Sequence, residues 1–322
     1  MQVFVGPNIV HGAREGAKKR VVVAVGRRSV EHDDTDSALL LQPHRHVTPS
    51  PNARLNERPN YRILIKPPTR LVKYGRLETH TYQILYDTEA THWWLAARRN
   101  IVLDLINQRY RDRDDLEVLD AGCGTGLMLQ ELSLLGTASG VDISEEALQF
   151  CRRRGLVNVQ HADILKLPFA SNRFDLVTAL DVLEHLDDDG AALREFSRVL
   201  KPGGRVFIFV PAHRWLWSLQ DDVSHHKRRY VSRTLRDAVA GSGLEIERQT
   251  YVSTLLLPVI YAGRQWLKLR MKFRNDYDTE NDLHPAWSNG LLRRIFESEI
   301  RILRRIDMPF GASLLCVARK VG

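Results

Sequence analysis

Short apolar runs alternate with helical patterns along the middle of the chain. The helical patterns cover about 127–135, 144–154 and 191–200. Strands that alternate with helices predict right-handed βαβ units and a mostly parallel sheet covered on both faces. The apolar runs expected to form its strands are 116–121, 138–143, 157–164, 174–180 and 205–210.

Two further strands are predicted near the end of the chain, at 244–252 and 313–319. The residues between them, about 254–310, include a helical pattern at 290–305. This segment is too long for an ordinary connection between strands. We interpret it as a helical insertion that covers or extends the sheet.

Before the first strand, residues 88–109 have the pattern of an amphipathic helix. Its apolar side carries Trp94, Ala97, Ile101 and Leu105 at the spacing of one buried face. We expect Trp94 and its neighbour Trp93 to be core or cofactor-covering residues rather than substrate contacts.

Composition places the chain among ordinary globular proteins. Of 322 residues, 43% are hydrophobic and 27% charged, which excludes collagen-like, wholly disordered and multi-span membrane proteins. The three cysteines form no CxxC pair and no cluster with histidine, so neither a disulfide scaffold nor a metal site is expected. With no signal-peptide pattern at the start, these features favour a reducing, cytoplasmic location.

The positive charge is concentrated in the first quarter of the chain. Residues 1–76 hold 14 Lys+Arg and 6 Asp+Glu, whereas residues 77–322 hold 33 of each. Much of the first segment is polar and lacks sustained periodicity, which predicts a basic, disordered extension followed by one folded domain. Because the folded part carries no positive surplus, nucleic acid is not an expected partner.

The strongest chemical signal is a glycine-rich loop with acids at successive strand ends. The first strand runs into Asp120 and then Gly122, Gly124 and Gly126, before a helix begins. Glycines let a backbone approach a ligand closely, and helix amides face the same space. A plain strand-to-helix turn is the alternative. Asp142 ends the next strand, and Ser144 is the better helix cap, which would leave Asp142 free for a ribose.

Five segments in this order resemble the motifs of class I S-adenosylmethionine-dependent methyltransferases, in a bacterial type 11/12-like subgroup. They are VLDAGCGTG (118–126), GVDIS (140–144), HADILKLPF (161–169), FDLVTALDVLEHL (174–186) and LKPGGRVFIFVPA (200–212). The resemblance implies S-adenosylmethionine as cofactor. It also implies an α/β, Rossmann-like, doubly wound, mostly parallel seven-stranded sheet with a reversed last strand and the helical insertion before it.

The resemblance also assigns cofactor roles. Asp120 and the backbone of the three glycines, Gly122, Gly124 and Gly126, would hold the methionine part, with Leu180 in the wall beside it.

The adenosine part would lie along the second and third strand ends. Asp142 would bind the ribose diol with Ile143 against the adenine, and Asp163 would meet the adenine amino group with Ile164 flanking the ring.

Several alternatives to an enzyme with a small-molecule, sugar or lipid-linked acceptor stay open. The fold can serve a cofactor-binding sensor or scaffold without turnover, although no motif here is visibly broken. A nicotinamide-dependent oxidoreductase needs a third glycine where Leu127 stands. Amino-methylating nucleic-acid enzymes often carry Asn/Asp-Pro-Pro-aromatic where this chain has Asp181-Val-Leu-Glu. The sequence leaves the accepting atom undetermined.

A general base is needed only if the accepting atom carries a proton that must leave. His185, after the fourth predicted strand, and His226 and Tyr230, after the fifth, are the candidate catalytic residues. Arg228 and Arg229 suit a bidentate contact with an anionic acceptor. A purely structural role for these loops is the alternative.

The insertion opens with an uncharged stretch, 252–263, and then becomes basic. Trp266 lies between Arg264 and Lys268, which is typical of a helix at a membrane interface. Residues 252–274 therefore predict a peripheral membrane contact. The alternative is a hairpin that packs on the sheet.

Overall fold

The computed structural model describes residues 79–274 and 286–322. The basic extension expected over residues 1–76 lies outside these ranges. Within them, no helix combines the length and apolar character that crossing a membrane requires.

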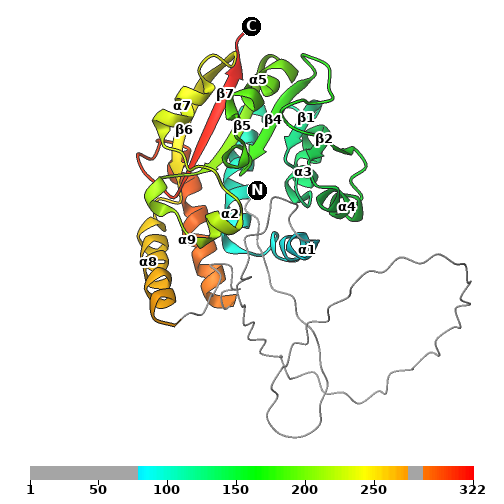
Figure 1. The fold of residues 1–322 in the computed structure, drawn as a ribbon. Helices are drawn as coiled ribbons and strands as arrows, with labels where there is room; N and C mark the ends of the chain where they lie inside the picture. The colour runs from blue at the N-terminus through cyan, green and yellow to red at the C-terminus, as the bar shows by residue number, and fades with distance from the viewer. Residues whose placement is uncertain (1–78, 275–285) are drawn as a thin grey trace, which may run out of the picture. The chain divides into compact units, whose positions relative to one another are not determined.

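One sheet of seven strands organises the described chain (Figure 1). Its order is β3-β2-β1-β4-β5-β7-β6, and β7 runs antiparallel to both of its neighbours. The doubly wound, mostly parallel sheet with a reversed last strand is therefore confirmed. The strands are β1 (Leu116–Ala121), β2 (Gly136–Asp142), β3 (Val159–His161), β4 (Phe174–Leu180), β5 (Leu200–Pro211), β6 (Leu244–Val252) and β7 (Ser313–Lys320).

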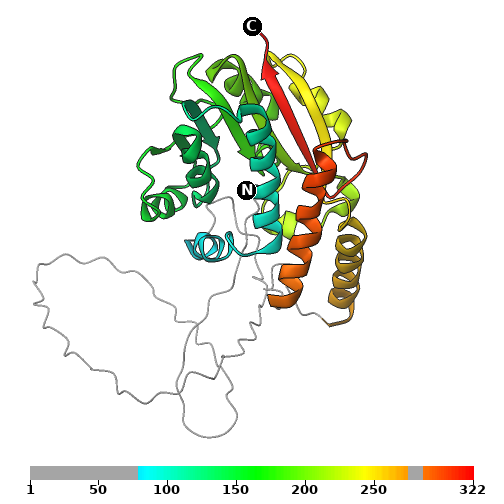
Figure 2. The ribbon, with the colours of Figure 1, turned by 180° about the vertical axis from the view of Figure 1, so that it is seen from behind.

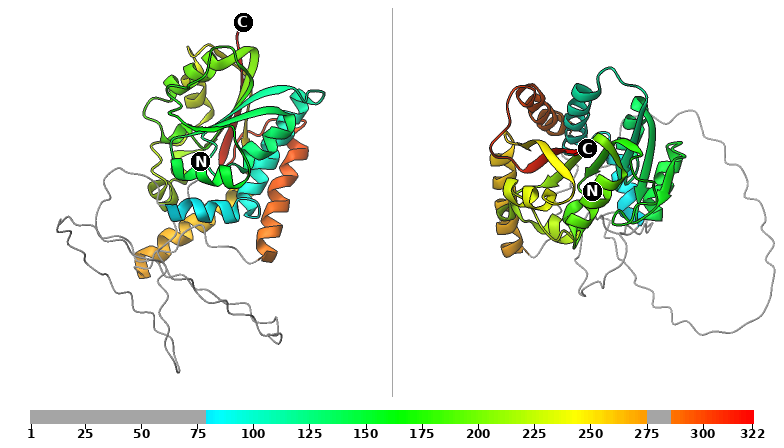
Figure 3. Two further views of the ribbon diagram at one scale, coloured as in Figure 1. Left: turned by 90° about the vertical axis from the view of Figure 1, so that its right-hand side faces the viewer. Right: turned by 90° about the horizontal axis from the view of Figure 1, so that it is seen from above.

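Helices cover both faces of this sheet (Figure 3). The α-helices are α1 (Thr79–Thr88), α2 (Trp93–Tyr110), α3 (Leu127–Leu132), α4 (Glu145–Arg153), α5 (Asp189–Val199), α6 (Leu219–Val223), α7 (Ser232–Val239), α8 (Leu257–Arg274) and α9 (Ala286–Leu303). Short 3-10 turns are η1 (Ser133–Leu135), η2 (Leu183–His185) and η3 (Arg214–Leu216).

The side chains of β5 show why helices pack on both faces of the sheet. Its side chains alternate, so Val206 and Ile208 pack with α5 and α7 while Phe207 and Phe209 pack with α2 and α9. Two hydrophobic cores result, one on each side of the sheet. A strand that is apolar on both sides is typical of a sheet buried in the middle of a domain.

One prediction about the helices needs adjustment. The pattern at 88–109 was expected as one helix, but α1 ends at Thr88 and α2 starts at Trp93. The predicted buried face of α2 is confirmed, because Trp94, Ala97 and Ile101 are buried. The insertion forms α8 and α9, and α9 packs along α2 (Figure 2).

Strand β3 is shorter than the predicted run 157–164. Val157 is exposed, and beyond His161 the chain turns because the Leu165 amide donates to Asp163 Oδ1 at 2.9 Å. An edge strand with one pairing partner tolerates this early end.

The strand order places a crevice at the carboxyl ends of β1 and β4. In parallel sheets, ligands bind where the order of strands reverses direction, and here β1 lies between β2 and β4. The glycine-rich loop after β1 and the residues after β4 meet at this point.

Candidate functional site

The loop after β1 is held in a fixed conformation by β2. The amides of Gly122 and Cys123 both donate to the Val141 carbonyl, at 2.8 and 2.9 Å. Gly122 has a φ of 79°, and a Cβ added there would lie 2.5 Å from Val182 Cγ2. Only glycine therefore fits this turn without displacing its neighbours.

A cavity opens between this loop and the N-terminal helices. Its lining combines loop, strand-end and helix residues, among them Glu89, Arg98, Asp120, Gly122, Gly124 and Leu180. Asp120 and Leu180, both expected near the methionine part of a cofactor, thus share one cavity with two of the glycines.

Asp120 is the buried acid of this cavity. Thr178 donates its hydroxyl to Asp120 Oδ1 at 2.7 Å. Burial raises the pKa of Asp120 to about 6, against the effects of the Thr178 hydrogen bond and of the Arg98 charge. A cationic ligand stabilises the ionised form of such a carboxylate, because a nearby positive charge offsets the cost of ionisation.

Asp142 lies next to the same loop. The sequence predicted that it would be free of partners, but two backbone amides bind its carboxylate. The Gly124 amide donates to its Oδ2 and the Ser144 amide to its Oδ1, both at 2.9 Å. Ser144 does cap α4, accepting from the Ala147 amide. Each Asp142 oxygen keeps a second lone pair, so the carboxylate can accept two further hydrogen bonds. Ile143 beside it is 69% exposed.

The third strand end contributes less than expected to the described crevice. Asp163 is exposed and its carboxylate closes the turn to Leu165. Ile164 is buried in the core with Ala162 and Leu167. Neither Asp163 nor Ile164 lines the cavity.

Arg98 connects the cavity to the end of β4. It lines the cavity and forms a buried ion pair with Asp181, the residue after β4. Burial lowers the pKa of Arg98 to about 10. Asp181 has a φ of 54°, a backbone conformation that costs energy outside glycine and is often found at functional sites.

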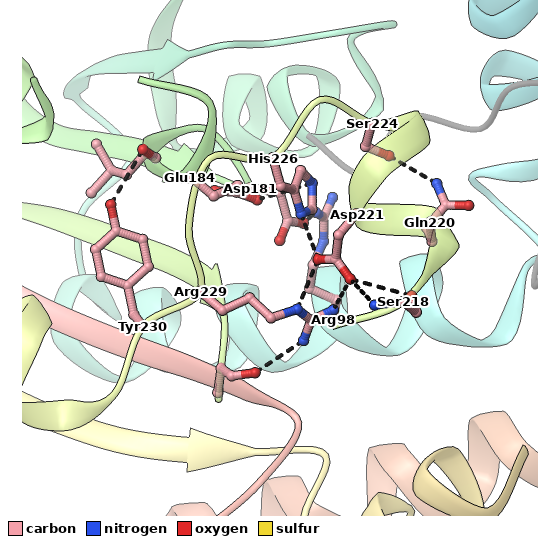
Figure 4. A network of polar contacts seen from close by, with 12 residues as sticks. Arg98, Asp181, Glu184, Ser218, Gln220, Asp221, Ser224, His226, Arg229 and Tyr230 are labelled. Atoms are coloured by element: carbon pink, nitrogen blue, oxygen red, sulfur yellow. Dashed lines mark hydrogen bonds and ion pairs between the residues drawn. The ribbon is translucent and has the colours of Figure 1, made fainter. Parts of the chain in front are cut away.

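Beyond Asp181, a polar cluster forms from Glu184, His185 and His226. Figure 4 shows two of its members, Glu184 and His226. The ligand-type atoms of the three residues all lie within 4.8 Å of one another. Burial raises the pKa of Glu184 to about 7 and lowers the pKa of His226. The sequence shows no metal-ligand cluster at close spacing, whereas the fold brings His226 beside His185, 41 positions earlier in the chain.

The loop that carries His226 is fixed by Asp221. Arg229 donates to both carboxylate oxygens of Asp221, at 2.7 and 2.9 Å, and to the Ala212 carbonyl at 2.9 Å. His226 Nδ1 lies 2.9 Å from Asp221 Oδ1. Every nitrogen of the Arg229 guanidinium thus has a protein acceptor, as Figure 4 shows.

Arg228 and Tyr230 are also bound to the protein. Arg228 donates to Asp189 Oδ2 at 3.1 Å and to the carbonyls of Leu186 and Asp187. The buried Tyr230 hydroxyl lies 2.7 Å from Asp189 Oδ2. These contacts support the structural alternative for Arg228, Arg229 and Tyr230 over the expected acceptor contacts.

The comparison with known families agrees with the geometry of the β1 loop. Residues 119–208 match the family model described as "Methyltransferase domain", and they include the glycine-rich loop, β2, β4 and most of β5. Residues 119–208 are thus similar to a methyltransferase domain, and the sheet has the strand order expected of class I methyltransferases. S-adenosylmethionine is the cofactor of this family.

Two curated relatives of this domain are ubiquinone biosynthesis O-methyltransferases. The protein from Alkalilimnicola ehrlichii is 32% identical over 155 residues, which are 43% of this chain and 62% of the relative. The one from Xanthomonas oryzae is 33% identical over 135 residues, 37% and 56% of the two chains. The match thus spans about six tenths of the relatives' length.

Among solved structures, one similar chain comes from the complex of the Haloferax volcanii Trm112 methyltransferase activator with a methyltransferase. It is 19% identical, with a TM-score of 0.48 over 76% of this chain and 94% of that chain. At this level of likeness, the assignment rests on the strand order and the family match.

Sequence reasoning missed the cover that α1 and α2 place over the methyltransferase loop. Glu89 accepts a hydrogen bond from Thr125 at 2.6 Å and pairs with Arg154. The sequence alone assigned no role to Arg98. A signal existed, because Arg98 is four residues after Trp94 on the same helix face, and its guanidinium lies 5.5 Å from the Trp94 ring.

Proposed function

We propose that this chain is an S-adenosylmethionine-dependent O-methyltransferase whose acceptor is a small or lipid-linked molecule with a hydroxyl group. The observation that carries the proposal is the cavity in which the buried Asp120 faces the fixed glycine loop. The names of the relatives favour a hydroxyl oxygen as the accepting atom and a ubiquinone precursor as the first acceptor to test.

The residues present fit the cofactor. Asp120 would accept from its ammonium group, since a buried carboxylate with a raised pKa favours a cationic partner. Asp142 has lone pairs left for two ribose hydroxyls, and the exposed Ile143 offers an apolar face to the adenine. The family's roles for Gly124, Gly126 and Leu180 remain part of the proposal, as do those for Asp163 and Ile164 at the outer end.

When bound, S-adenosylmethionine supplies an electrophilic methyl group. The protein then has to align the acceptor, exclude water and take up the hydroxyl proton. The polar cluster Glu184, His185 and His226 is the group after β4 that can take up this proton, because burial keeps His226 neutral. Tyr230 is not part of this proposal, since burial raises the pKa of its hydroxyl far above the usual range.

Calorimetry with S-adenosylhomocysteine, followed by transfer of a labelled methyl group, tests the proposal. We expect saturable binding and label in a ubiquinone-type catechol acceptor, but not in the same acceptor with its hydroxyls already methylated. Binding without transfer to any acceptor of a broad panel would favour the sensor or scaffold alternative.

We further infer that α8 contacts a lipid surface. Ile260, Arg264 and Leu267 are its half-buried side. The opposite side is exposed and apolar, and Trp266 is 58% exposed there; the side comprises Pro258, Val259, Ala262, Trp266 and Leu269. Lys268 flanks it, which suits an interfacial helix. The start of the predicted contact segment does not take part, because residues 252–254 are buried.

A further inference from the structure

The polar cluster Glu184, His185 and His226 contains buried charge and acceptor atoms that the protein leaves unsatisfied. Glu184 is completely buried, and neither of its carboxylate oxygens has a hydrogen-bond partner among the described residues. Within the same part of the chain, His226 Nε2 also has none and lies 3.9 Å from Glu184 Oε1. Buried acceptors of this kind are costly unless something pairs with them.

The charges of Arg98 and Arg229 favour ionised Glu184, but neither side chain donates a hydrogen bond to it. Arg229 is engaged by Asp221 and the Ala212 carbonyl. Arg98 forms its ion pair with Asp181. The cluster therefore gathers acceptors, while the hydrogen bonds of both arginines go to Asp221, Asp181 and the Ala212 carbonyl.

His226 is held in the orientation that a metal ligand needs. Asp221 fixes Nδ1 at 2.9 Å, which makes Nδ1 the protonated nitrogen and leaves the lone pair on Nε2. The Arg229 fork in turn fixes Asp221. A carboxylate behind a histidine is the usual outer shell of a metal-bound imidazole.

We propose that Glu184, His185 and His226 bind a divalent transition-metal ion of the zinc type. One carboxylate and two imidazoles are a common donor set for such ions. Ligand atoms about 2.1 Å from a tetrahedral ion lie roughly 3.4 Å apart. The ligand atoms here, within 4.8 Å of one another, would need to approach by up to about 1.4 Å to reach this spacing.

The proposed site does not depend on the cofactor binding proposed above. It is an alternative to proton uptake by His226, because Nε2 cannot bind an ion and accept a proton at the same time. Three protein ligands leave a fourth position open for water or an acceptor oxygen. An oxygen bound to such an ion loses its proton more readily. A role for the ion in activating the acceptor would follow from the same geometry.

Titration of the metal-free full chain with Co²⁺, followed by visible absorption, tests the proposal. We expect one saturable site with d–d bands of a four- or five-coordinate ion, and competition by Zn²⁺. Glu184→Gln and His226→Gln should each lower Co²⁺ affinity more than about 100-fold. Asp221→Asn, which alters the outer shell, should lower it by about 10–100-fold.

His161→Gln is the matched control, since His161 is exposed on β3 and outside the cluster. Its Co²⁺ affinity should equal that of the wild type. Melting curves and S-adenosylhomocysteine affinity are measured for every variant. If Glu184→Gln does not fold, His185→Gln at the half-buried ligand takes its place.

Absence of saturable binding by the wild type would overturn the proposal. Unchanged affinity in the folded ligand variants, or an equal loss in His161→Gln, would overturn it as well. Because S-adenosylhomocysteine binding is recorded separately, failure of the metal site is distinguishable from failure of the proposed function.

Discussion

Asp120 and Asp142 end neighbouring strands, but their side chains are engaged differently. Asp142 accepts two backbone amides and so shapes the loop around Gly124. Asp120 accepts one side-chain hydrogen bond, from Thr178, and faces the cavity. At the level of single residues, Asp142 therefore combines a structural task with the proposed ribose contact, whereas Asp120 has capacity left for a ligand.

Replacing Asp142 should weaken cofactor binding. We expect Asp142→Ala to reduce S-adenosylhomocysteine affinity by about 1.5–3 kcal/mol, the scale of hydrogen bonds to a charged group. Calorimetry measures the affinity of this variant. Asp163→Ala, at an exposed strand end, is the control and should lose less affinity. Wild-type affinity in Asp142→Ala would remove this residue from the site.

The raised pKa of Asp120 predicts a pH-dependent affinity. A ligand ammonium group prefers the ionised carboxylate, and the ionised fraction falls as pH drops through about 6. Affinity for S-adenosylhomocysteine should thus be full near pH 8 and decline below about pH 6, by up to tenfold per pH unit. Asp120→Asn should bind weakly at all pH values, with a shallower profile. An equally steep profile in that variant would assign the titration to another group.

The adjacent arginines should respond differently to the same substitution. Arg229 is 4% exposed in its side chain and binds Asp221 through two nitrogens, a geometry that lysine cannot reproduce. Arg229→Lys should lower the free energy of unfolding by about 1.5–3 kcal/mol.

Arg228, whose side chain is 35% exposed, is the control for Arg229. Arg228→Lys should cost less than about 1 kcal/mol. Thermal melts of both variants measure the two losses of stability. Equal stability of Arg229→Lys and the wild type would show that the fork does not anchor the loop.

At the level of elements, α2 links the hydrophobic core to the site. Trp93 and Trp94 on its first turn contact Phe296 of α9, with ring centroids 6.2 and 6.3 Å apart. Arg98, one turn later, reaches Asp181 at the end of β4. The insertion thus supports the helix that positions Arg98.

Helix α8 carries the prediction about membranes. Full-length protein should co-sediment with vesicles that contain anionic lipid, and Trp266 fluorescence should shift to the blue. Trp266→Ser with Leu269→Ser removes exposed apolar side chains and should reduce binding at least about tenfold, at about 25 cal/mol per Å² of apolar surface. The exposed Leu134→Ser, distant in sequence on η1, should bind as the wild type does. Equal binding by the double variant would exclude α8 as the contact.

At the level of the whole molecule, residues 77–322 carry as many acidic as basic side chains, and residues 1–76 are basic. The described lining of the cavity begins at Leu85, and the buried residues include Tyr82. Deleting residues 1–76 should therefore leave S-adenosylhomocysteine affinity within about twofold of the wild type and shift the isoelectric point from about 9.5 towards neutrality. Calorimetry and isoelectric focusing check both. A large loss of affinity would place part of the site in the deleted segment.

The sequence by itself determined the alternating strands, the glycine loop, and the acids Asp120 and Asp142. These features depend on neighbours within a few positions: apolar periodicity sets the strands, and a turn too tight for a Cβ requires Gly122. Local rules of this kind can be read from a linear pattern. For the same reason, Ser144 was identified correctly as the cap of α4.

Only the tertiary structure decided which polar residues meet. Glu184 and His226 come together because the chain after β5 returns to β4, and Arg229 faces Asp221 rather than the crevice. Pairings between residues far apart in sequence have no periodic signature. They depend on which polar groups meet once the sheet and its helices have excluded water. The same packing leaves the buried Glu184 carboxylate with no hydrogen-bond partner among the described residues.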